Sequence, residues 1–274
     1  MTLKTRNRLL KFFLLASLCV VALSLATFII SVLSHRIIEP PAFRIPAFLD
    51  KQPLTKNSFT ALMLSFLILL LYVPFCFYFL LKFFENTQTT EIIFFTGFLL
   101  ACLAECARFI TICLGLWLSF TNILIIAGDI VLFGRTLAPL SFLCAAILSD
   151  TDQRQDIERN YIILIMASLV FAVAIPMNTA RITSTGLVTE GFMILINIMR
   201  FFLLLTAVVS FFINGVRKNS MEHKSLAYSA GGLLLSYSIL VSTDSFLFLV
   251  LGTAGLIAGT YIYLTSLHKM YMWS

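Results

Sequence analysis

The chain has 274 residues, of which 60% are hydrophobic and 12% are charged, and its formal net charge is +6. Soluble domains carry roughly 25% charged residues, so this composition excludes a protein whose main solvent is water. Most of the basic residues lie at the ends of apolar runs, and they form no single basic face. This distribution argues against nucleic-acid binding and for a chain oriented in a lipid bilayer.

Apolar runs of the length that crosses a bilayer, about 17 to 25 residues, recur along the whole sequence. Reading them against prolines, glycines and charges predicts eight helical spans in one transmembrane domain that covers residues 1–274. The spans are expected near residues 9–33, 61–84, 92–118, 123–148, 161–180, 191–214, 226–241 and 246–267. The predicted fold class is therefore all-α, a polytopic transmembrane helix bundle.

The distribution of lysine and arginine predicts the orientation of these spans. In this topology, eleven lysine and arginine residues fall on the side of the N-terminus and five on the other side. Because basic residues concentrate in cytoplasmic loops, both termini are expected in the cytoplasm. Short loops further favour a multi-pass protein of the plasma membrane, in particular a bacterial inner membrane.

Two connections leave alternatives open. The outer segment 34–60 contains Pro40, Pro41, Pro46 and Pro53, a density that prevents a regular helix. An ordinary interfacial loop is the favoured interpretation, and a lid over the mouth of the bundle is the alternative. The span 226–241 is short, so a re-entrant pair with the last span is an alternative to two full crossings.

Glycines in the last span, with a G-x-x-x-G spacing from Gly255 to Gly259, let helices approach closely. Packing within the chain is favoured over dimerisation.

Five charged residues interrupt the predicted spans. They are Glu105, Arg108, Asp129, Arg135 and Arg200. A charge exposed at the bilayer centre costs about 2.5 to 3.5 kcal/mol, so five would cost on the order of 12 to 17 kcal/mol. The five side chains are therefore expected to face the interior of the bundle and to be paired, hydrated or liganded.

The spacing of these charges predicts some of the pairs. Glu105 and Arg108 are three residues apart and share one face of a helix, so they can pair directly. Asp129 and Arg135 differ by six residues, about 240° of helical rotation, and need partners on other helices.

Three arginines against two carboxylates leave one positive charge over. Guanidinium groups bind carboxylates and phosphates bidentately. The leading hypothesis is a buried cavity in which Arg108, Arg135 and Arg200 bind or transport a small anion or an anionic lipid headgroup. In this hypothesis Glu105 and Asp129 orient the arginines. The alternative is a structural network in which the five charges satisfy one another.

Two other functions stay open. The first alternative is a sensor or partner subunit that transmits ligand binding to another protein. The second is a lipid-modifying enzyme that uses Asp129 or Glu105 as acid or base. No set of catalytic residues, metal ligands or cofactor-binding residues is predicted. The three histidines, His35, His223 and His268, lie at opposite membrane surfaces.

The pairs Gly128-Asp129 and Thr243-Asp244 resemble a pattern of the eight-span lysoplasmalogenase-like membrane proteins. The resemblance covers only these few residues. Glu105, Arg108 and Arg200 have no counterpart in that pattern, so the resemblance assigns no family.

Overall fold

The structure is a computed structural model that describes residues 2–34, 58–85, 87, 89–116, 121–148, 156–183, 186, 188–218, 221–243 and 245–272. The helices are α1 (Leu3–Leu33), α2 (Phe59–Phe83), α3 (Thr90–Ala104), α4 (Cys106–Cys113), α5 (Thr121–Leu148), α6 (Ile157–Ala174), α7 (Met193–Arg217), α8 (Met221–Ser242) and α9 (Phe246–Met272). Two short strands, β1 (Met177–Ile182) and β2 (Val188–Glu190), lie between α6 and α7.

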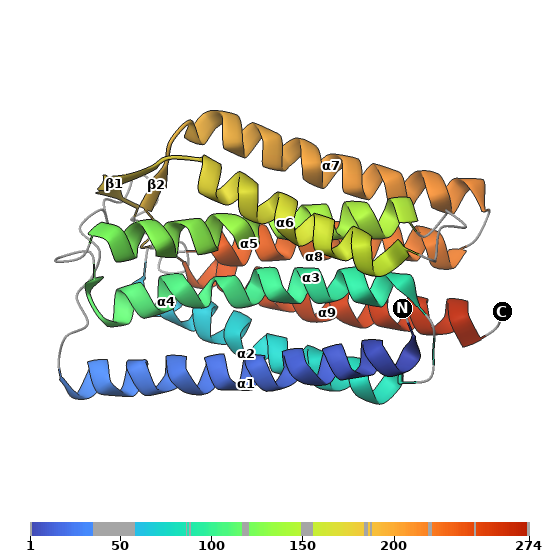
Figure 1. The fold of residues 1–274 in the computed structure, drawn as a ribbon, viewed down its shortest axis with the longest axis horizontal. Coiled ribbons are helices and arrows are strands. Elements are labelled where there is room, and N and C mark those ends of the chain that lie inside the picture. Colours follow the sequence, from blue (N-terminus) through green and yellow to red (C-terminus); the bar gives the residue numbers. More distant parts are fainter. Residues whose placement is uncertain are drawn as a thin grey trace.

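Eight helical spans within the described residues are long and apolar enough to cross a membrane, with α3 and α4 together forming the third. This confirms the all-α class and the predicted number of spans. The helices lie side by side along the long axis of the molecule, and the two termini lie at the same end (Figure 1). The strand pair lies at the other end. The side of the membrane that each end faces stays a prediction.

The predicted helix over 161–180 is wrong in its last residues, because α6 ends at Ala174. Pro176 has no N–H to continue a helix, and the residue before a proline favours extended backbone. Ile175 is indeed extended, with ψ of 121°. The chain then forms an antiparallel hairpin in which Met177 pairs with Glu190. The hairpin is not among the elements expected from the sequence.

The seventh span is longer than predicted. α8 covers 22 residues, from Met221 to Ser242, and is long enough to cross a membrane by itself. This length favours two full crossings over a re-entrant pair. The segment 35–57, which includes the proline-rich part of the outer loop, lies outside the described residues.

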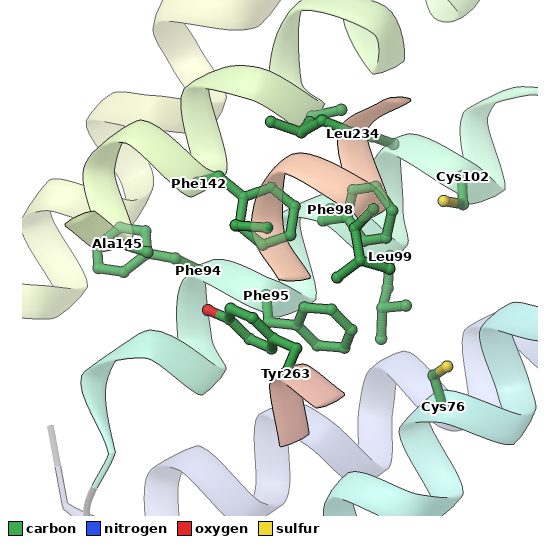
Figure 2. Close-up of a cluster of buried hydrophobic side chains, with 14 of the residues drawn as sticks. Cys76, Phe94, Phe95, Phe98, Leu99, Cys102, Phe142, Ala145, Leu234 and Tyr263 are labelled. Carbon is green, nitrogen blue, oxygen red and sulfur yellow. The ribbon is translucent and has the colours of Figure 1, made fainter. Parts of the chain in front are cut away.

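The third span lies at the centre of the bundle, since 78% of the residues in its apolar 18-residue stretch are buried. Its phenylalanines meet rings from α5 and α9, as Figure 2 shows. The Phe95 and Tyr263 rings stack with centroids 5.2 Å apart, and Phe98 and Phe142 are also 5.2 Å apart. Such aromatic pairs contribute about 0.5 to 1.5 kcal/mol each beyond the area that they bury. They fix the position of α3 relative to its neighbours.

The glycines of α9 pack against α8. A methyl group at Gly255 would collide with the Ser236 hydroxyl, and one at Gly259 would lie 3.0 Å from Leu233. These contacts support the interpretation that the G-x-x-x-G spacing serves packing within the chain.

Arg6 attaches α1 to the turn between α2 and α3. Its side chain is buried, and its guanidinium donates to the carbonyl oxygens of Phe84 at 2.5 Å, Glu85 at 3.2 Å and Thr87. Those carbonyls follow the last turn of α2, where the helix leaves acceptors unsatisfied and favours a positive charge. The first span is therefore held to the bundle by a charged contact as well as by apolar packing.

Candidate functional site

Glu105 lies at a break in the third span. It ends α3 and precedes α4, and its carbonyl oxygen accepts hydrogen bonds from the backbone N–H groups of both Arg108 and Phe109. Such a shared acceptor marks a local tightening of the helix at this point. The break leaves the Glu105 side chain inside the bundle, where the residue is 1% exposed.

The Glu105 carboxylate bridges two arginines. Its Oε2 lies 3.3 Å from Nε of Arg108, and its Oε1 lies 3.3 Å from Nε of Arg135. The first contact confirms the pair predicted from the spacing of three residues. The second supplies the partner on another helix that Arg135 was expected to need.

A glycine brings Arg135 within reach of Glu105. A methyl group at Gly134 would lie 2.7 Å from Cβ of Ala104 and 2.9 Å from the carbonyl oxygen of Ala101. No real side chain tolerates such distances, so α5 approaches α3 this closely only because residue 134 has no Cβ. Arg135, the next residue, is thereby placed beside Glu105.

Arg108 is more enclosed than Arg135 and Arg200, at 1% exposed. Its Nη1 donates to the carbonyl oxygen of Val241 at 2.9 Å, in the last turn of α8, where a positive charge is favourable. Its guanidinium carbon lies 4.3 Å from the centroid of the Phe66 ring, a cation–π distance. Its Nη2 is buried and has no hydrogen-bond partner among the described residues.

Tyr237 joins this group from α8, one turn before Val241. Its hydroxyl donates to Oε1 of Glu105 at 3.4 Å and lies 3.5 Å from the carbonyl oxygen of Ala101. Both contacts are long, so they orient the carboxylate weakly. Tyr237 was not predicted as a site residue because, in the sequence, a tyrosine within a span resembles an ordinary core residue. Tyr237 lies four residues before Val241, on the same face of α8. This position indicates a role at the site only once Arg108 is known to contact Val241.

Arg200 on α7 pairs with Glu190, a residue that the sequence analysis also missed. Nη2 of Arg200 donates to Oε1 of Glu190 at 2.6 Å, and the two side chains are 17% and 5% exposed. Glu190 ends β2, and it was overlooked because it precedes the predicted span. Arg200 also interacts electrostatically with Arg135 and Tyr237. The Arg200–Glu190 pair therefore neighbours the Arg135–Glu105 pair.

These residues form what we call the polar cluster. Its members are Glu105, Arg108, Arg135, Glu190, Arg200 and Tyr237. Four of the five charged residues singled out from the sequence belong to it. The exception is Asp129, which makes no ion pair with any described residue. The predicted role of Asp129 in orienting the arginines therefore has no contact to support it, and Glu190 takes that position.

The charges of the polar cluster do not cancel. Three guanidinium groups face two carboxylates, which leaves one positive charge when all are ionised. Three buried nitrogens, Nε and Nη2 of Arg108 and Nε of Arg200, lack a hydrogen-bond partner among the described residues, although Nε of Arg108 lies 3.3 Å from Oε2 of Glu105. Buried donors are nearly always satisfied in native proteins. The cluster thus has both the charge and the free donors to accept an anion.

The described residues contain no group of three or more histidine, cysteine or carboxylate side chains that would hold a metal ion. All six cysteines have free thiols.

No protein-family model matches the chain, and neither a curated protein nor a solved structure matches it.

Proposed function

We propose that the chain is a multi-pass protein of the plasma membrane that binds a small anion, or the anionic headgroup of a lipid, at the polar cluster and transports it. The observation that carries the proposal is the unbalanced guanidinium charge together with the unpartnered donors on Arg108 and Arg200. An ionisable group within a membrane span marks a functional site by default.

The arginines have different roles in this proposal. Arg108 is enclosed and held by Glu105, Val241 and the Phe66 ring, so it supplies a fixed positive field. The Arg135 and Arg200 side chains are 15% and 17% exposed, so an anion reaches the cluster past them. A guanidinium that is already oriented by a carboxylate binds an anion with little further loss of side-chain entropy.

The net charge of one limits the ligand. A monovalent anion neutralises the cluster, whereas a divalent anion leaves a negative charge within the membrane, which is costly. Chloride, nitrate, a short monocarboxylate or a phosphodiester headgroup carries the required single charge.

The first test is a thermal-shift screen of the detergent-purified full chain. The anion is varied as its choline salt at constant ionic strength, and phosphatidylglycerol is added in a separate series to distinguish a lipid headgroup from a free ion. A ligand at a hundred times its dissociation constant stabilises the folded state by about 2.7 kcal/mol. We expect such a shift for the wild type and its loss in Arg200→Gln.

Arg159→Gln is the matched control, because Arg159 forms an exposed ion pair with Asp156 outside the cluster. Its response to the anion should equal that of the wild type. An anion that passes this test is then assayed for flux in liposomes. If no anion or anionic lipid stabilises the wild type, and Arg200→Gln merely lowers the melting temperature, the cluster is a structural network and the proposal is wrong.

A further inference from the structure

A third buried carboxylate, apart from Glu105 and Glu190, lies near the end of the bundle where the termini meet. Glu91 is in the first turn of α3 and is 1% exposed. The Tyr271 hydroxyl donates to its two oxygens at 2.8 and 3.1 Å, and the Thr90 hydroxyl donates to Oε2 at 3.1 Å. Within the described part of the chain, no lysine, arginine or histidine forms an ion pair with it. All of its described partners are therefore neutral hydroxyls.

A buried carboxylate with only neutral partners lacks a compensating charge. The N-terminus of α3 supplies a partial positive charge, but this offsets only part of the cost of removing a carboxylate from water. This differs from Glu105 and Glu190, each of which has an arginine partner. Glu91 has no such partner among the described residues, so one positive charge would compensate it.

Two unsatisfied oxygens belong to residues that neighbour Glu91 in the sequence or interact with it in the fold. The Tyr263 hydroxyl and Oγ1 of Thr89 are buried and have no hydrogen-bond partner among the described residues. Tyr263 is fully buried and interacts electrostatically with Glu91 and Tyr271. Figure 2 shows its hydroxyl on the side of Phe94, which follows Glu91 by three residues on α3. Thr89 directly precedes α3 and makes no capping bond with its side chain.

We propose that Glu91, together with the hydroxyls of Thr89, Thr90, Tyr263 and Tyr271, forms a binding site for a dehydrated alkali-metal cation such as Na⁺. The available ligand atoms are all oxygens, which suit hard cations. One carboxylate balances one positive charge, whereas Ca²⁺ sites gather several carboxylates. The site involves no residue of the polar cluster, so it does not depend on the proposed anion binding.

The test measures thermal unfolding of the purified full chain while NaCl replaces choline chloride at constant total chloride. Because the anion never changes, the result is independent of any anion site. Mass action predicts that Na⁺ at nine times its dissociation constant raises the ratio of folded to unfolded protein about tenfold. We expect this Na⁺-dependent rise in melting temperature for the wild type and its loss in Glu91→Gln.

Two controls and one direct measurement accompany it. Glu85→Gln removes an exposed carboxylate at the same end, and Tyr261→Phe alters a 71% exposed tyrosine of α9, so both should respond to Na⁺ as the wild type does. If Glu91→Gln does not fold, Tyr271→Phe replaces it and should weaken the Na⁺ response. Binding of ²²Na⁺ to the wild type should saturate with one site per chain.

Three results would overturn the proposal. The first is a wild type that neither binds ²²Na⁺ nor responds to NaCl. The second is a Na⁺ response that Glu91→Gln retains in full, since the cation would then bind elsewhere. The third is a stabilisation that follows pH and not Na⁺ concentration, because the carboxyl would then be neutralised by a proton.

Discussion

Replacing Glu105 with glutamine should destabilise the protein more than any other single charge removal in the spans. The Glu105 carboxylate pairs with both Arg108 and Arg135, and its side chain is 2% exposed. Removing one partner of a buried ion pair costs about 3 to 5 kcal/mol, because the remaining charge stays buried without compensation. Because glutamine has nearly the same shape as glutamate, the loss of stability reflects the removed charge and not a change in packing.

The magnitude converts into a measurable shift in melting temperature. An entropy of unfolding of about 2.1 cal/mol/K per residue gives roughly 0.6 kcal/mol/K for a chain of 274 residues. A loss of about 3 to 5 kcal/mol therefore lowers the melting temperature by about 5 to 9 °C. A thiol-reactive fluorescent dye reports the transition in detergent, because Cys76, Cys102 and Cys113 are buried until the bundle unfolds.

Asp129→Asn is the matched control. Asp129 lies in a neighbouring span and makes no ion pair with any described residue, so its replacement should cost less than about 1 kcal/mol. The double variant Glu105→Gln with Arg108→Met should lose less than the sum of the two single changes, since it removes both charges of one pair. Equal shifts for Glu105→Gln and Asp129→Asn would refute the reasoning that Glu105 organises the cluster.

Three further predictions test the bundle. Gly134→Ala should cost about 1 to 3 kcal/mol through overpacking against α3, whereas Gly232→Ala, with no atom within 4 Å of the added methyl, should be neutral or stabilising in the same melting assay. Arg6→Gln should cost about 1.5 to 3 kcal/mol through its lost bonds to carbonyls in 84–87, while the exposed Arg8→Gln should cost little; equal melting temperatures would contradict the anchoring role. Finally, the charge bias predicts a cytoplasmic C-terminus, so a green fluorescent protein fused there should fluoresce and an alkaline phosphatase fusion should be inactive. The reverse result would show that the predicted topology is inverted.

The sequence by itself determined the number and approximate limits of the spans. Transmembrane helices satisfy their backbone hydrogen bonds internally and need a minimum apolar length, so a run of apolar residues is enough to predict each one. The sequence also identified Glu105, Arg108, Arg135 and Arg200 as charges that must be compensated, because charge burial is costly whatever the tertiary arrangement. The Glu105–Arg108 pair followed from helix geometry, since three residues bring two side chains to one face.

The tertiary structure alone decided which charges meet across helices. Whether Arg135 pairs with Glu105 or with Asp129 depends on the close approach of α5 to α3 at Gly134, and Arg200 finds Glu190 only because β2 folds back toward α7. Neither distance is encoded in the spacing along one helix. The first arises from the packing of α5 against α3, and the second from the turn of the chain between β2 and α7. The short hairpin was likewise hidden, since a few extended residues after Pro176 resemble the end of an apolar span until their backbone partners are known.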